Sequence, residues 1–268
     1  MGHGFKIIMG LGNPGKQYQN SRHNAGYMAL ATFVKVRNFS DPSRTGRSLI
    51  SKAHFEGQRI IMAWPQTYMN NSGQAARDLL NFYKENSTNL LVIHDDMDIP
   101  VGKLKVTSGG GSGGHNGLIS IIEEIGEEFD RLRVGIGRPQ KGFFGGDYAP
   151  YVLSSFDQDE LEGIDGALDL AAQAIGIWVH KGVAACQRKI NVKPKRPKEE
   201  TESAPAGLVG TQAGKESPQA GQEGFKAGHK SVRDGSEAGK ESPQASQEIL
   251  QVGHEGAQDG DPTSRGRG

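Results

Sequence analysis

The stretch Phe5-Lys-Ile-Ile-Met-Gly10-Leu-Gly-Asn-Pro-Gly15 places a short apolar run directly before a glycine-rich turn. A run of this length that ends in glycine predicts a buried β-strand with a turn at its carboxyl end. Comparable runs recur along the first 190 residues, at positions 59–64, 89–94, 103–107 and 132–136. Amphipathic stretches lie between them, and this alternation predicts an α/β domain.

The amphipathic stretches predict the helices of this domain. Residues 24–35 and 72–83 each gather apolar side chains on one helical face, and residues 118–125 form a shorter apolar segment. The longest predicted helix spans about residues 157–180. Its apolar stripe consists of Leu161, Ile164, Leu168, Ala171, Ala172, Ile175 and Val179.

The composition divides the 268-residue chain into two parts. Residues 199–268 contain 13 Gly and a single aromatic residue, Phe225, so no hydrophobic core can form there. The formal net charge of zero combines +5 for residues 1–198 with −5 for this tail. We therefore predict a folded domain over residues 1–190, a basic linker over 191–198 and a disordered, low-complexity acidic tail over 199–268.

The tail also contains a duplicated segment. Gly214-Lys-Glu-Ser-Pro-Gln-Ala-Gly-Gln-Glu223 recurs as Gly239-Lys-Glu-Ser-Pro-Gln-Ala-Ser-Gln-Glu248. Solenoid repeats need apolar ridges that stack on one another and about three copies or more, and these repeats have neither. The duplication therefore indicates a solvated low-complexity segment.

The single cysteine and the lack of long apolar runs exclude several classes of protein. Cys186 alone cannot form a disulfide scaffold or a cysteine-cluster zinc site, and it fits a reducing compartment. No stretch approaches the roughly 20 apolar residues of a membrane helix. We expect a soluble cytoplasmic protein.

Two glycine-rich motifs follow predicted strands. The first, at residues 10–15, matches the dinucleotide fingerprint, but Pro14 interrupts the turn and residues 34–37 offer no acidic group for a ribose. The glycines either let the backbone pass close to a substrate beside Asn13 or form a tight turn capped by Asn13. The second motif, at residues 108–117, lacks the ending of a P-loop. It is either a flexible turn or a loop in which His115 and Asn116, at a helix N-terminus, meet a carbonyl or phosphate.

Three polar clusters also lie at the ends of predicted elements. His23 comes immediately before a helix, where an imidazole can act as a base near neutral pH. Residues 65–73 bring amides to the carboxyl edge of one strand, and residues 94–98 bring three carboxylates to that of another. The carboxylates suggest either a divalent metal or an aspartate that orients a histidine, and we favour the second because hard cations need more oxygen ligands.

Together these motifs resemble bacterial-type peptidyl-tRNA hydrolase. The resemblance covers about residues 6–183 and rests on Gly10-Leu-Gly-Asn13-Pro-Gly15, Tyr18, Arg22-His23-Asn24, Pro65-x-Thr-Tyr-Met69-Asn70, His94-Asp95-x-x-Asp98, Gly-Gly-His115-Asn116-Gly117 and Arg131-Leu-Arg133-Val-Gly-Ile-Gly. It implies a single-domain, usually monomeric esterase with a twisted mixed β-sheet between helices. The implied substrate is peptidyl-tRNA, cleaved at the ester that joins the peptide to the tRNA 3′ end, with no cofactor.

The resemblance also implies roles for individual residues. His23 would be the general base and Asp95 its orienting partner, while Asn13 and Asn70 would position the ester and the attacking water. The substrate-binding set would consist of Tyr18, Met69, Asn116, Arg133 and Lys105. Arg133 lies where the family holds a tRNA phosphate. One position departs: where some family members have a second lysine or arginine in the strand before the glycine loop, this chain has Thr107, with Lys105 two residues earlier on the same strand face.

Other functions remain as alternatives at this point. An RNA-binding protein on the same fold could have lost catalysis, and a nucleotide-dependent enzyme is a third reading. A covalent route through Ser21 or Cys186 is disfavoured, because Ser21 is poorly spaced from His23 and Cys186 has only Arg188 nearby as an activating group. The basic residues after the last helix form a solvated linker that could supplement electrostatic attraction to tRNA.

Overall fold

The computed structural model describes residues 4–139 and 147–192. The predicted acidic tail at 199–268 and all of the predicted basic linker except Asn191 and Val192 lie outside these residues. Among the described residues, no helix is both long and apolar enough for a membrane crossing.

A seven-stranded mixed sheet forms the centre of the domain, in the order β2-β3-β4-β1-β5-β7-β6. The four central strands run parallel, whereas β2, β3 and β6 pair antiparallel with their neighbours. The strands are β1 (Phe5–Gly10), β2 (Ser43–Thr45), β3 (Ser48–Phe55), β4 (Gln58–Pro65), β5 (Leu90–Asp96), β6 (Leu104–Ser108) and β7 (Asp130–Gly135).

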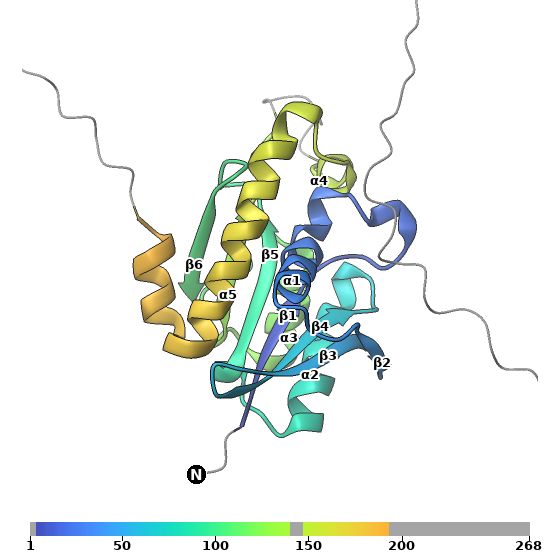
Figure 1. The fold of residues 1–268 in the computed structure, drawn as a ribbon. Coiled ribbons are helices and arrows are strands. Elements are labelled where there is room, and N and C mark those ends of the chain that lie inside the picture. Colours follow the sequence, from blue (N-terminus) through green and yellow to red (C-terminus); the bar gives the residue numbers. More distant parts are fainter. Residues whose placement is uncertain (1–3, 140–146, 193–268) are drawn as a thin grey trace, which may run out of the picture. The chain divides into compact units, whose positions relative to one another are not determined.

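Helices cover both faces of this sheet. On one face, where Figure 1 shows two helices crossing the strands, lie α1 (Ala25–Val36) and α5 (Leu161–Ile190). On the other face lie α2 (Ser72–Tyr83) and α3 (Asn116–Ile125). The short helix α4 (Ala149–Leu153) contacts the 3₁₀ turn Arg22–Asn24, which directly precedes α1.

Side-chain alternation along the strands explains the two layers. In β1, Ile8 packs into the cluster under α1 and α5, while its neighbours Ile7 and Met9 pack against α2 and α3. Successive strand residues point to opposite faces, so a strand that is covered on both faces reads as a continuous apolar run. The single α/β domain predicted from the sequence is thus confirmed.

Two strands and one short helix were not predicted. β2 and β3 lie in a stretch where Ser48 and Ser51 are buried, which hides the apolar alternation. The turn between β3 and β4 has a well-defined conformation, in which Glu56 and Gly57 have φ angles of 49° and 76°. Two positive φ values in succession are typical of a type I′ hairpin.

The last helix continues past its predicted end at residue 180. It reaches Ile190, and it is interrupted at Gly182, where φ is 74° and ψ is 177°. This backbone conformation redirects the final turns toward β6 (Figure 1).

The first glycine motif serves a close backbone contact between β1, β5 and α1. A Cβ atom on Gly26 would lie 2.2 Å from the Ile93 carbonyl oxygen, and one on Gly10 would lie 2.4 Å from the Gly26 carbonyl oxygen. Leu11 N–H donates to the Ile93 carbonyl at 2.8 Å, and Tyr27 N–H donates to the Leu11 carbonyl at 3.0 Å. The sequence suggested either a close approach to a substrate or a tight turn capped by Asn13. The structure shows a third reason for the glycine at position 10, which is the close approach of β1 to helix α1.

This contact predicts a strong effect of a single methyl group. We expect Gly26→Ala to lower the free energy of unfolding by about 3 kcal/mol, because its Cβ has only backbone atoms to displace. The matched control is Gly166→Ala in α5, where a Cβ meets nothing within 4 Å and helix propensity should add up to about 1 kcal/mol. Urea unfolding of both variants measures the difference, and an unchanged stability of Gly26→Ala would contradict the close contact.

Candidate active site

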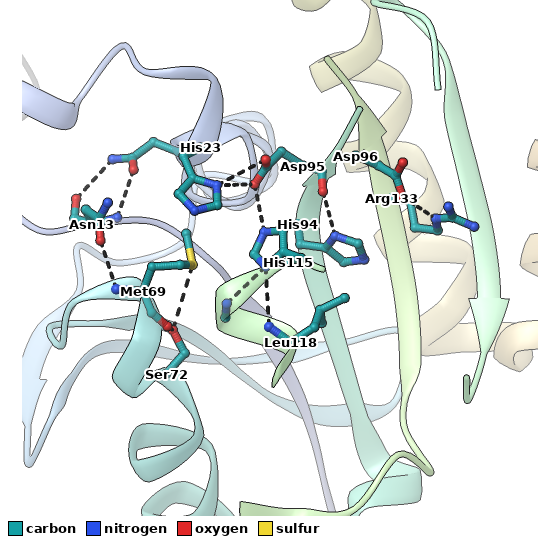
Figure 2. A network of polar contacts seen from close by, with 12 residues as sticks. Asn13, His23, Met69, Ser72, His94, Asp95, Asp96, His115, Leu118 and Arg133 are labelled. Carbon is teal, nitrogen blue, oxygen red and sulfur yellow. Dashed lines mark hydrogen bonds and ion pairs between the residues drawn. The ribbon is translucent and has the colours of Figure 1, made fainter. Parts of the chain in front are cut away.

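A cluster of polar side chains lies at the carboxyl ends of β1, β4 and β5 (Figure 2). This edge is where open α/β sheets form their sites. The turn Arg22–Asn24 contributes a histidine, the end of β5 an aspartate, and the N-terminus of α3 a second histidine. Carboxyl ends of parallel strands meet at one edge, so motifs far apart in the sequence converge here.

His23 and Asp95 form a buried pair. The His23 Nδ1 atom lies 2.9 Å from Asp95 Oδ1 and 3.0 Å from Oδ2, and the two residues are 7% and 3% exposed. A carboxylate accepts hydrogen bonds, so Nδ1 carries the proton in the neutral ring. The lone pair of His23 is then on Nε2, the nitrogen that is available to take a proton from a substrate or water.

A second histidine shares the same carboxylate. His115 Nε2 lies 2.9 Å from Asp95 Oδ1. The other ring nitrogen, Nδ1, accepts the backbone N–H groups of Gly117 at 3.1 Å and Leu118 at 3.3 Å and so caps α3. Because Nδ1 accepts, Nε2 must donate to Asp95, and His115 is held as a neutral donor rather than a base.

The two histidines set the charge of Asp95. Burial alone would raise the pKa of this carboxyl, but His115 and His23 outweigh burial and hold the pKa of Asp95 well below its usual range. Asp95 is therefore a carboxylate across the physiological pH range. A buried negative charge of this kind would stabilise an imidazolium on His23, as a general base in this position requires.

Asn13 is fixed by backbone and side-chain partners. Its backbone N–H donates to Asn24 Oδ1 at 2.8 Å, and Asn24 Nδ2 donates back to its carbonyl at 3.1 Å. The Met69 N–H donates to Asn13 Oδ1 at 2.8 Å. These bonds orient the Asn13 amide with Oδ1 toward Met69, and Nδ2 is the end of the amide that remains to donate to a ligand.

Met69 joins the asparagine group to the histidine group. A Cβ atom on Gly117 would lie 2.6 Å from Met69 Sδ and 3.1 Å from His115 Cε1. Met69 and His115 thus meet over Gly117, and only glycine leaves room for both. The glycine of the His115-Asn116-Gly117 motif has a packing reason that the sequence did not reveal.

Arg22 anchors the turn that carries His23. This guanidinium is 2% exposed and forms ion pairs with Glu160 at 2.6 Å and Asp157 at 3.1 Å. It also lies over the rings of Tyr151 and Phe156, at 4.6 and 5.0 Å. A buried arginine with this many partners holds the adjacent backbone in one place, which sequence reasoning on His23 alone had missed.

The predicted phosphate-binding residues lie farther along the sheet. Arg133 on β7 pairs with Asp96 through Nε and Oδ2 at 2.6 Å, and it lies opposite Lys105 of β6 in the antiparallel register. Its neighbour Arg131 is buried, lies opposite Thr107, and donates to the carbonyls of Gly110 and Gly111 in the glycine-rich loop. Arg131 therefore fixes that loop rather than facing solvent.

Within the part of the chain that the structure describes, the remaining predicted residues make no hydrogen bond to the His23, Asp95 and His115 side chains. Asn70 and Asn116 are exposed, in the single turn Met69–Asn71 and at the first position of α3, and Tyr18 is half-buried in the turn Lys16–Tyr18. Asn70 directly follows Met69, and Asn116 directly follows His115. Their roles remain predictions.

The geometry of the site argues against three alternatives: a metal site, a covalent nucleophile and a dinucleotide-binding site. His23, Asp95 and His115 offer ligand atoms within 4.8 Å of one another, but His115 could give Nε2 to a metal only by losing its bonds to the α3 backbone. As for a covalent nucleophile, burial raises the pKa of Cys186 to about 11, and Ser21 Oγ donates to the Tyr18 carbonyl at 2.9 Å. The dinucleotide reading fails because α1 begins only at Ala25, well after Gly15.

His94 lies behind the site and is also buried. Its Nδ1 donates to the Asp95 carbonyl at 2.7 Å, and its ring packs edge-on against His115 with centroids 5.1 Å apart. Within residues 4–139 and 147–192, Nε2 of His94 has no hydrogen-bond partner. Burial, with a further contribution from His115, lowers the pKa of His94 to about 3.

This pKa predicts acid sensitivity. The unfolded chain takes up a proton on His94 near its ordinary pKa of about 6.5, whereas the folded chain does so only near 3. Stability should therefore fall as the pH decreases from about 6.5, by up to about 1.4 kcal/mol per pH unit from this group. Urea unfolding between pH 7 and 4.5 should show a shallower slope for His94→Gln, while exposed His54→Gln should match the unsubstituted chain. Equal slopes in all three would contradict the buried neutral state.

Comparison with known proteins identifies the family of the chain. The family model described as peptidyl-tRNA hydrolase matches residues 7–200. A peptidyl-tRNA hydrolase of Geobacter metallireducens is 41% identical over 189 residues, which cover 70% of this chain and 95% of that protein, and one of Dehalococcoides mccartyi is 40% identical over 188 residues, which cover 70% and 100%. The crystal structure of peptidyl-tRNA hydrolase from Acinetobacter baumannii superposes with a TM-score of 0.65 at 33% identity, covering 70% of this chain and 94% of that one. The chain belongs to the peptidyl-tRNA hydrolase family.

Proposed function

We propose that this chain hydrolyses the ester bond of peptidyl-tRNA, with His23 as general base and no metal ion. The observation that carries the assignment of the base is the buried contact between His23 Nδ1 and Asp95, at 2.9 and 3.0 Å. This contact leaves Nε2 of His23 as the proton acceptor and places the Asp95 carboxylate at the opposite ring nitrogen, Nδ1. Membership of the family supplies the substrate.

The reaction then follows from the site. His23 Nε2 takes a proton from water, and the hydroxide adds to the acyl carbon of the ester. Asp95 stabilises the resulting imidazolium. The tetrahedral oxyanion collapses, the carbon–oxygen bond to the tRNA breaks, and the imidazolium returns its proton to the departing 3′ oxygen. The products are a peptide with a free carboxyl group and a tRNA with a free hydroxyl group.

Two amides are placed to assist this reaction. Asn13 offers Nδ2, because its Oδ1 is already bound by the Met69 N–H, and Asn70 is exposed one residue later. A positioned N–H donor contributes about 3 kcal/mol to the stabilisation of an oxyanion in measured cases. We propose that these amides orient the ester and the water, and that Tyr18, Met69 and Asn116 contact the substrate around them.

The tRNA phosphates would bind along β6 and β7. Arg133 is half-buried and Lys105 is exposed, and the two residues face each other across the strands. Asp96 orients Arg133 but also offsets part of its charge. We also propose that the protein acts as a cytoplasmic monomer. A non-catalytic RNA-binding protein is not favoured, because the His23–Asp95 pair is intact.

Loss of the base should abolish hydrolysis. We expect His23→Ala to lower the rate at least about 100-fold while leaving tRNA affinity nearly unchanged, and Asp95→Asn to lower it less completely. The measurement is release of free tRNA from a peptidyl-tRNA, with His54→Ala as the control for an exposed histidine. A His23→Ala enzyme that kept more than about a tenth of the rate would contradict the assignment of the base.

Chelation should leave the activity unchanged. The negative charge of Asp95 is already stabilised by hydrogen bonds from His23 and from Nε2–H of His115. The carboxylate therefore does not need a metal ion to stabilise it. We expect full activity after extended dialysis against EDTA, assayed by the same release of tRNA. Activity that disappears with EDTA and returns with magnesium or zinc would restore the metal reading of the carboxylates at 95, 96 and 98.

A further inference from the structure

Helices α2 and α3 touch backbone to backbone about one helical turn beyond Met69 and His115. A Cβ atom on Gly73 would lie 2.0 Å from the carbonyl oxygen of Ser120 and 2.5 Å from its carbonyl carbon. Both residues are buried. An approach this close leaves no room for a side chain on α2, so it requires the glycine at position 73.

A hydrogen bond holds the same contact. The Gly73 N–H group belongs to the first turn of α2, where backbone N–H groups have no partner within the helix. It donates to Ser120 Oγ at 3.0 Å, whereas Asn71, directly before α2, makes no capping hydrogen bond with its side chain. The hydroxyl group of Ser120 thus caps α2 from the neighbouring helix, and the first turn of α2 depends on α3 for its position.

A second close contact joins the two helices nearer to the histidines. Met69 Sδ packs against Gly117 of α3, where a Cβ atom would lie 2.6 Å from the sulfur. Ser72, at the start of α2, is buried, and its Oγ donates to the Met69 carbonyl at 2.8 Å (Figure 2). The beginnings of α2 and α3 are therefore held together at two levels, by Met69 on Gly117 and by Gly73 on Ser120.

An exposed asparagine lies at the start of each helix. Asn70 is in the single turn Met69–Asn71 that leads into α2, and Asn116 is the first residue of α3. Asn116 and Ser120 are four residues apart, so they lie on the same side of α3. The distance between these two exposed asparagines therefore follows from how closely α2 approaches α3 at Gly73.

We propose that the contact between Gly73 and Ser120 fixes the distance between the two exposed asparagines and thereby determines the size of the acyl group accepted at the ester. This inference rests on the proposed function, in which both amides meet the substrate. Ser120 is then a positioning residue that acts through the amides. The competing explanation is packing alone, in which case loss of the contact would lower stability without changing substrate preference.

The same two helices provide a matched control. Arg77 follows Gly73 by four residues, and Glu124 follows Ser120 by four. Arg77 Nη1 and Glu124 Oε2 form an ion pair at 2.5 Å, which also joins α2 to α3 but lies one helical turn farther from the two exposed asparagines. Breaking this ion pair should loosen the helix pair without altering the distance between the asparagines.

The test compares kcat/KM of the full chain for two peptidyl-tRNAs, one with glycine and one with phenylalanine as the ester-linked residue. Ser120→Ala adds no bulk but removes the hydrogen bond that holds the spacing. We expect it to raise the ratio of kcat/KM, phenylalanine over glycine, about threefold. Gly73→Ala forces the helices apart and should raise the ratio about tenfold, as a misfit of one carbon atom does in measured cases. Arg77→Gln should leave the ratio unchanged.

Melting temperatures and pH profiles separate positioning from a general loss of structure. A Ser120→Ala variant that loses stability but keeps the original ratio would show packing alone and overturn the proposal, and this variant decides the matter where Gly73→Ala does not fold. A ratio that rises equally in Arg77→Gln would also overturn it. The pH dependence of kcat should be unchanged in Ser120→Ala, because His23 and Asp95 are untouched, and a shifted profile would assign the effect to the base instead.

Hydrolysis by the unsubstituted chain distinguishes this inference from the proposed function. If the unsubstituted chain releases tRNA from neither substrate, the proposed function fails and the inference fails with it. If it hydrolyses both substrates and Ser120→Ala keeps the original ratio, the inference fails alone.

Discussion

Backbone contact between β1, β5 and α1 is the constraint on which the site depends. Gly26 lies against the Ile93 carbonyl and Gly10 against the Gly26 carbonyl, so no side chain separates the helix from the two strands. His23 comes three residues before Gly26, and Asp95 comes two residues after Ile93. A separation larger by one methyl group would move the imidazole and the carboxylate apart by more than a hydrogen bond tolerates.

The site resolves an electrostatic conflict by sharing one carboxylate between two histidines. A buried carboxylate without partners would be protonated or would destabilise the fold. Asp95 instead accepts from His23 and His115, and each ring then has a different task. Nδ1 of His115 accepts from the α3 backbone, so its Nε2 donates to Asp95, whereas His23 uses Nδ1 for the same carboxylate and is the ring proposed to act as the base.

Much of this could be predicted from the sequence, because the strands of a doubly covered sheet are continuous apolar runs and the motifs lie at their ends. The pair His23 and Asp95 followed from the resemblance. What the sequence could not give were contacts that depend on three-dimensional register. The buried serines of β3 interrupt the apolar alternation by which a strand is recognised. The ion pairs of Arg22 involve residues more than 130 positions away. The sequence suggested that His115 could meet a ligand, whereas its ring donates to Asp95 in the structure. The acidic tail stays a prediction.

The anchoring of Arg22 by Asp157 and Glu160 has a consequence for synthesis of the protein itself. The turn that carries His23 is synthesised early, but the carboxylates that anchor it belong to the start of α5. This contact cannot form before residues 157 and 160 have been synthesised, because a chain emerges from the ribosome from its N-terminus onward. While it is still attached to its own tRNA, a growing copy therefore lacks a fixed His23 until residue 160 has emerged. The position of His23 therefore depends on a part of the chain that is synthesised more than 130 residues after it.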